Sequence, residues 1–122
     1  MSRYSEIVMD HFVQPRNRGK LENPSGVGVV GVPGEGPFLV FQIACTGGII
    51  AAAAFQCHNC GVMVASGSVL TTMTIGKTLQ ECRLISADDI ILQLDGVPPD
   101  KLHGPRFALE AMRLAIQNSS CS

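Results

Sequence analysis

The sequence has no excess of charge of either sign and no long hydrophobic run. Its 122 residues include 9 basic and 10 acidic side chains, giving a formal net charge of −1. It therefore lacks the basic surface typical of proteins that bind nucleic acid or anionic membranes. The longest apolar run, Ile49 to Phe55, is far shorter than the roughly 20 residues that span a bilayer. The first residues contain no apolar signal core, so we expect a cytoplasmic rather than a secreted protein.

Several catalytic signatures are also missing. The sequence contains no paired catalytic carboxylates, no Gly-x-Ser-x-Gly elbow and no phosphate-binding loop. The glycines between positions 26 and 36 precede a predicted strand rather than a helix, so they do not match the dinucleotide fingerprint. We therefore expect a protein that is not an enzyme.

What the sequence does contain is typical of one globular domain over residues 1–122, with 46% hydrophobic and 16% charged residues. Hydrophobic patterning predicts a short helix, three strands and then three or four helices. The expected bounds are 4–12 for the first helix, 27–32, 38–45 and 49–57 for the strands, and helices that begin after Cys60, Thr78, Ser86 and near Pro105. Strands grouped early and helices grouped late predict an α+β fold with an antiparallel sheet covered by helices.

Local signals define the connections. Gly47 and Gly48 supply the positive φ angles that a tight hairpin turn requires. Thr78 with Glu81 and Ser86 with Asp89 form capping boxes at two helix starts. We expect irregular loops at 33–37 and an extended segment at 97–101, where consecutive prolines disfavour helix. Residues 118–122 are expected to form a frayed tail.

Five cysteines is an odd number, which argues against a fully paired disulfide framework and favours free thiols, metal ligands or redox groups. Cys45 and Cys82 occupy positions typical of core residues. Cys121 lies in the predicted tail, where we expect it to be exposed and incidental.

Cys57 and Cys60 form a Cys-x-x-Cys pair where the last strand ends and a helix begins. Such a pair can bind one metal ion or form a redox disulfide, and a helix N-terminus stabilises a thiolate at Cys60. The alternative is structural: Cys57 faces the core and Cys60 is an inert apolar residue. His103 and Glu35 lie in predicted loops and are further candidate ligands, whereas His11 is expected to pack or to face solvent.

The chain resembles the U-type iron–sulfur cluster scaffold family, which includes IscU and the N-terminal domain of NifU. The matching motifs run in order along the chain: 4–12, 15–19, 31–33, 60–61, 65–68, 76–78 and 96–103. The resemblance implies a SufE/NifU-like fold with a three-stranded antiparallel sheet and helices against it. It also implies that a [2Fe-2S] cluster is assembled on three cysteines with the help of an aspartate and a histidine, or that zinc binds there. The implied partners are a cysteine desulfurase and an Hsp70-type chaperone, the latter recognising a Leu-Pro-Pro-Val-Lys loop.

The departures from the family pattern fall on the implied site. Glu35 stands at the first cysteine, Pro37 at the aspartate and Gly104 at the third cysteine. Only Cys60 and His103 match by residue and position, and Cys57 corresponds to no family cysteine. The chaperone loop reads Val-Pro-Pro-Asp-Lys over residues 97–101.

Three hypotheses follow. The first is a scaffold-like protein that binds iron, a [2Fe-2S] cluster or zinc through Cys60 and His103, with Glu35, Cys57 or a second copy of the chain completing the ligands. The second is a protein-interaction module that keeps the scaffold fold and has lost cluster binding. The third is a thiol–disulfide enzyme that uses Cys57 and Cys60.

Overall fold

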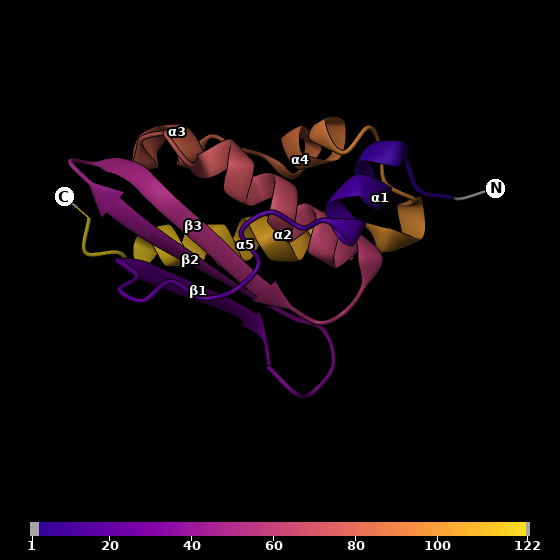
Figure 1. Ribbon diagram of the computed structural model, residues 1–122, viewed down its shortest axis with the longest axis horizontal. Helices are drawn as coiled ribbons and strands as arrows, with labels where there is room; N and C mark the ends of the chain where they lie inside the picture. Colours follow the sequence, from indigo (N-terminus) through magenta and orange to yellow (C-terminus); the bar gives the residue numbers. More distant parts are fainter. Residues whose placement is uncertain (1–2, 122) are drawn as a thin grey trace.

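The computed structural model describes residues 3–121. It contains one sheet of three antiparallel strands, with helices packed against the sheet (Figure 1). The elements are α1 (Glu6–Val13), β1 (Gly26–Gly31), β2 (Phe38–Thr46), β3 (Ile49–Cys57), α2 (Gly61–Thr74), α3 (Leu79–Arg83), α4 (Ala87–Gln93), the 3₁₀ turn η1 (Pro99–Lys101) and α5 (His103–Gln117). The strand order is β1-β2-β3. The α+β class and the three-stranded antiparallel sheet are confirmed.

The hairpin between β2 and β3 forms as predicted. Gly47 and Gly48 have φ angles of 61° and 79°, values that suit glycine at both central positions of a tight hairpin turn. The resulting register places Phe41 opposite Phe55 in the middle of the sheet, and both rings are fully buried. The alanines of residues 51–54 therefore lie in a strand, even though alanine favours helix by propensity.

The two long helices cover one face of the sheet, with α2 over β3 and α5 over β1 and β2. Their contact is close because of glycine. A Cβ atom on Gly28 would lie 1.9 Å from the carbonyl oxygen of Ala111 in α5, so any larger residue would push the helix off the strand. The core is consequently built from the inner sheet face and the facing sides of α2 and α5.

The helix starts follow their predicted caps. Both capping boxes are present, at Thr78 with Glu81 and at Ser86 with Asp89. The hydroxyl oxygen of Ser5 accepts a hydrogen bond from the backbone N–H of Val8 at 3.0 Å, so α1 begins at Glu6 rather than at Tyr4.

The segment 97–101 was expected to be extended, and that prediction is wrong. Pro99–Lys101 form a 3₁₀ turn, in which the N–H of Lys101 donates to the carbonyl of Pro98 at 2.9 Å. Proline fits the first position of a helical turn because its missing N–H would have no partner there. His103, expected before the last helix, is the first residue of α5.

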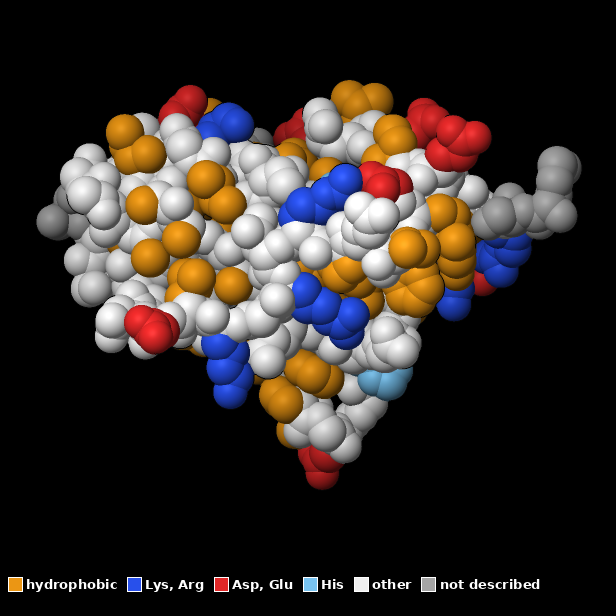
Figure 2. Space-filling model, in the orientation of Figure 1, with side chains coloured by type: hydrophobic (Ala, Val, Ile, Leu, Met, Phe, Trp, Pro, Cys, Tyr) orange, Lys and Arg blue, Asp and Glu red, His pale blue; other side chains and the backbone are white. Residues whose placement is uncertain are grey.

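The surface carries charges of both signs. Figure 2 shows lysine and arginine side chains interspersed with acidic ones on the face that it displays. Within residues 3–121, no helix combines the length and the apolar character needed to cross a membrane.

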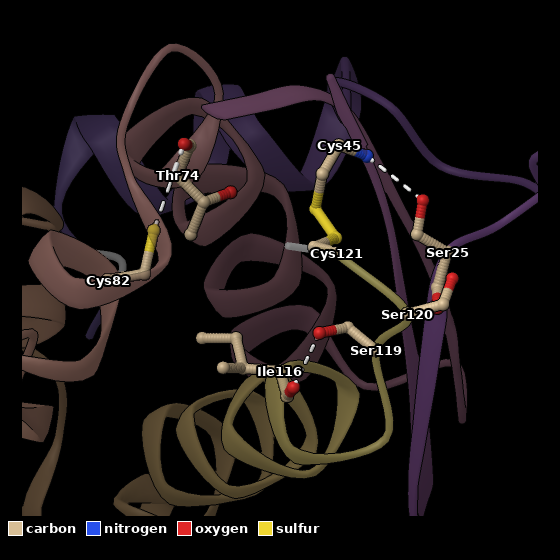
Figure 3. Close-up of a disulfide and its surroundings, with 8 residues drawn as sticks. All are labelled: Ser25, Cys45, Thr74, Cys82, Ile116, Ser119, Ser120 and Cys121. Atoms are coloured by element: carbon tan, nitrogen blue, oxygen red, sulfur yellow. Dashed lines mark hydrogen bonds between the residues drawn. A yellow bond between two sulfur atoms is a disulfide. The ribbon is translucent and has the colours of Figure 1, made fainter. Parts of the chain in front are cut away.

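The C-terminal segment is fastened to the sheet instead of frayed, which corrects two predictions. A disulfide joins Cys121 to Cys45 on β2 (Figure 3). In addition, the N–H of Ser120 donates to the carbonyl of Ser25 at 2.9 Å. Cys121 is thus neither incidental nor free, and Cys45 is a half-buried bridge residue rather than a free core thiol. Cys82 is fully buried, as predicted, and Cys57 and Cys60 are free. Ser122 lies outside the described residues.

Helix α1 is anchored by a buried histidine. His11 is 9% exposed, and its Nδ1 is 2.7 Å from Oγ of Ser68 in α2. The same Ser68 oxygen accepts a hydrogen bond from the N–H of Arg16 at 2.8 Å. Burial lowers the pKa of His11 and the nearby Arg16 lowers it further, while Asp10 acts in the opposite direction.

Removing the disulfide should destabilise the fold. The two cysteines are 76 residues apart in sequence, and freeing a loop of that size raises the entropy of the unfolded chain enough to cost about 4 kcal/mol. The Cys45→Ser/Cys121→Ser variant should unfold at lower urea concentration than the oxidised wild type. Adding a reductant should lower the midpoint of the wild type only; an equal shift in the variant would contradict the assignment.

Protonation of His11 should destabilise the fold in acid. Because the folded protein binds this proton less tightly than the unfolded chain, the free energy of unfolding should fall as the pH drops through about 6.5. The His11→Asn variant keeps a polar atom near Nδ1 and does not titrate, so it should lose this part of the pH dependence. Urea unfolding at several pH values tests this, with the exposed His58→Asn as control. A slope in His11→Asn equal to that of the wild type would refute the prediction.

Candidate functional site

The Cys-x-x-Cys pair spans the junction between β3 and α2. Cys57 is the last residue of β3, and Cys60 is the N-cap residue of α2. Between them the chain turns sharply, with the N–H of Cys60 donating to the carbonyl of His58 at 2.7 Å. His58 and Asn59 are exposed, so the two cysteines lie on either side of a solvent-facing turn.

Cys57 faces the core. It is 8% exposed and stands opposite Leu39 on the inner sheet face. Burial raises the pKa of the Cys57 thiol to about 11; the positive charge of Arg18 opposes this rise, and Cys60 adds to it. Arg18 is nearby because residues 17–19 bond to β3 at Phe55. A thiol with this pKa is protonated near neutral pH, which suits a core residue better than a nucleophile.

Cys60 is the accessible cysteine of the pair. It is a free, half-buried thiol at the start of α2, and its side chain makes no capping hydrogen bond. The adjoining Gly61 lies close to two aromatic rings, because a Cβ atom built there would be 3.7 Å from Tyr4 and 3.8 Å from Phe12. Sequence spacing does not predict that Tyr4 and Phe12 lie near Gly61, although both residues belong to the family-like opening motif.

His103 lies at the corresponding end of the other long helix. It is the half-buried first residue of α5, and its ring meets that of Phe107 edge-on at a centroid distance of 6.3 Å. The next residue, Gly104, contacts Val62 in the first turn of α2. The N-termini of α2 and α5 therefore adjoin, which brings the positions of Cys60 and His103 to the same end of the molecule.

Glu35 lies in the loop between β1 and β2, which extends away from the helices in Figure 1. Its side chain is exposed, and its backbone N–H donates to the carbonyl of Val32 at 2.9 Å. Pro37, at the position of the family aspartate, is exposed in the same loop. Across residues 3–121, no three His, Cys, Asp or Glu side chains are grouped closely enough to hold a metal ion.

Gly104 leaves no room for the third cysteine of the family. It is buried, and a Cβ atom on it would lie 2.8 Å from Cγ1 and 3.1 Å from the carbonyl oxygen of Val62. Oγ of Ser66 would be 3.2 Å away. Val62 is itself fully buried, so it cannot move aside cheaply. The glycine is therefore part of the packing between α2 and α5.

The fold is a small α+β domain in which the N-termini of two long helices adjoin. The chain belongs to the family described as the NifU-like N terminal domain, whose model matches residues 3–120. Relatives named as iron–sulfur cluster assembly scaffold protein IscU are similar over most of the chain. The Escherichia coli K12 relative is 39% identical over 117 residues, which cover 93% of this chain and 91% of the relative. IscU 1 of Archaeoglobus fulgidus is 39% identical over 113 residues, which cover 93% of this chain and 74% of that protein.

Solved structures agree on the fold. The chain resembles the crystal structure of a protein assigned as an iron–sulfur cluster assembly scaffold of the SUF system from Fervidobacterium islandicum AW-1. The TM-score is 0.73 at 24% identity, covering 93% of this chain and 96% of that one. The N-terminal part of a NifU-like protein from Brucella abortus matches with a TM-score of 0.59 at 19% identity, covering 96% of this chain and 90% of that one.

Introducing cysteine at the two positions where the family pattern has one should have unequal structural costs. Gly104→Cys should lower the free energy of unfolding by about 1–3 kcal/mol, because its side chain overlaps Val62. Glu35→Cys lies in an exposed loop and should change stability by less than about 0.5 kcal/mol. Urea unfolding of both variants under reducing conditions tests the difference. Equal stabilities would show that α2 and α5 separate freely at Gly104.

Proposed function

We propose that this chain is a scaffold-like protein of iron–sulfur cluster assembly that binds iron or a [2Fe-2S] cluster through Cys60 and His103. The observation that supports this most is the contact between Gly104 and Val62, which brings the N-termini of α2 and α5 together. Two helix N-termini favour negative charge between them. A thiolate and an imidazole at that place are ligands suited to iron or to a cluster.

The chain supplies too few ligands to hold a cluster alone. A [2Fe-2S] cluster takes about four protein ligands, and the candidates are Cys60 and His103, with Glu35 across an exposed loop and Cys57 in the core. We infer that a second protein supplies the rest while the cluster is assembled or passed on. A cysteine desulfurase is the partner that family membership favours, and a second copy of the chain is the other source of ligands. Phe12 of α1 lies close to Gly61, the residue after Cys60, and is 36% exposed; Val13, the next residue of α1, is 67% exposed. The two side chains offer such a partner a contact surface.

A second candidate function is a protein-interaction module without cargo. The packing at Gly104 favours this function, because Gly104 of α5 lies against Val62 of α2 and leaves no space for a ligand side chain. In this case the module would bind the desulfurase or another assembly factor with no iron or sulfide present. The third hypothesis, a thiol–disulfide enzyme, is weakened by the buried, high-pKa thiol of Cys57.

Anaerobic reconstitution with iron and sulfide, with and without a cysteine desulfurase, separates the two functions. We expect iron and visible absorbance to be retained by the wild type, most strongly with the desulfurase present. Cys60→Ala and His103→Ala should reduce the bound iron several-fold, because each removes a ligand. The exposed His58→Ala should retain it, as a control for the loss of any histidine in this region.

The contrary result is also informative. A colourless, iron-free protein under both conditions would exclude the cargo-binding function. Calorimetric titration of that protein with the desulfurase would then test the interaction module, which predicts saturable binding that Phe12→Ser/Val13→Ser weakens. Metal analysis of the purified protein would show whether zinc is bound in place of iron.

A further inference from the structure

A groove of about 590 Å³ lies between the last turns of α2 and the two short helices α3 and α4. Figure 2 shows the outline of the molecule indented at the top, between the segments that Figure 1 labels α3 and α4. Helix α2 has 14 residues and is therefore about 20 Å long. Because Cys60 is at its start and the groove is at its other end, the groove is separate from the candidate site.

The groove is lined by both apolar and polar side chains and is flanked by two unusually exposed leucines. Leu84 follows α3 and is 80% exposed, and Leu92 belongs to α4 and is 75% exposed. They are the most exposed large hydrophobic side chains among residues 3–121. Met73 and Ile85 line the groove between them. A single exposed leucine is ordinary, but two that border one groove together with Met73 and Ile85 are typical of a docking surface.

The charges at the groove are mainly negative and are fixed in place. The carboxylate of Glu81 accepts a hydrogen bond from the N–H of Thr78 at 3.0 Å, and that of Asp89 accepts one from the N–H of Ser86 at 2.8 Å. Each carboxylate keeps a second oxygen for another donor. The lining cation, Lys77, directs its Nζ to the carbonyl of Met73 at 3.0 Å, at the negative end of α2. The groove therefore complements a positively charged partner.

The walls also restrict the backbone conformation of that partner. They are formed by helices α2, α3 and α4 and by Lys77, Leu84 and Ile85 in the connections between them. No residue of β1, β2 or β3 lines the groove, so it offers an extended peptide no edge of the sheet. None of the described residues that line the groove is aromatic, whereas grooves that bind polyproline segments are lined by aromatic side chains. The remaining class of peptide ligand is an amphipathic helix, because it needs only apolar contacts and suitably placed charges.

We propose that this groove docks an amphipathic helix of a partner protein. The apolar stripe of that helix packs between Leu84 and Leu92, and its flanking Lys or Arg side chains pair with Glu81 and Asp89. This is a second interaction surface, and it holds whether or not Cys60 and His103 bind iron.

The test uses a fluorescent helical peptide of about 14 residues, built from Leu and Lys at helical spacing and titrated against the protein by anisotropy. The wild type should bind it saturably. Leu84→Gln/Leu92→Gln should weaken binding at least about tenfold, and both leucines are exposed enough for the fold to persist. The control, Val29→Gln/Val32→Gln, alters two exposed residues outside the groove and away from α1, so it should bind like the wild type. Equal binding by the two double variants, or no saturable binding by the wild type up to about 1 mM, would overturn the proposal.

A second arm tests the charge of the partner. Glu81→Gln/Asp89→Asn keeps the capping oxygens and removes both charges, so it should weaken binding of the Leu/Lys peptide at low salt and much less at high salt. A matched Leu/Glu peptide should bind at least about tenfold more weakly than the Leu/Lys peptide. The net charge of the whole chain is only −1, so a general attraction would not produce this difference. Equal affinity for the two peptides would exclude a basic helix as the occupant.

Discussion

The contact between α2 and α5 at Gly104 and Val62 is the constraint on which the site depends. Each helix lies on its own part of the sheet, and the absence of a side chain at Gly104 lets their first turns meet. That meeting places a cysteine and a histidine from distant parts of the chain at one end of the molecule. The same contact occupies the space in which a third thiol would stand. At this position the close contact between α2 and α5 therefore excludes an additional thiol ligand.

This exclusion suits a protein that shares its cargo. A site with a full set of its own ligands would hold a cluster firmly, whereas a site with two must obtain the others from a second protein. The affinity of the site for the cluster then depends on whether that partner is bound, and the cluster is released when the partner dissociates. The exposed ring of Phe12 in α1 lies close to Gly61, next to the accessible thiol, where such an encounter would take place. The groove formed by α2, α3 and α4 lies at the opposite end of α2, so the two surfaces can be occupied together.

Most of the fold could be predicted from the sequence because its signals are local. The Gly47–Gly48 turn sets the hairpin between β2 and β3. The capping boxes that begin at Thr78 and Ser86 each span only four residues, and they set the starts of α3 and α4. The pairing of Cys45 with Cys121 could not be predicted, because it joins a strand to a segment 76 residues away and depends on how α5 ends. The match of Cys60 and His103 to a family motif identified two candidate ligands. The steric conflict that a side chain at Gly104 would meet could not be predicted from the sequence. It depends on how α2 and α5 pack, which places Val62 against Gly104.

The bond between Cys45 and Cys121 also changes the connectivity of the molecule. It closes residues 45–121 into a covalent ring that contains β3 and every helix after it, while α1, β1 and residues 38–44 of β2 lie in a linear arm outside it. A single backbone cut within 46–120 opens the ring but leaves one covalently connected molecule. A cut before residue 45 releases the arm, which carries the aromatic residues beside Cys60. The half of the molecule that lines the groove is thus protected against the loss of a fragment, and the arm that flanks the thiol is not.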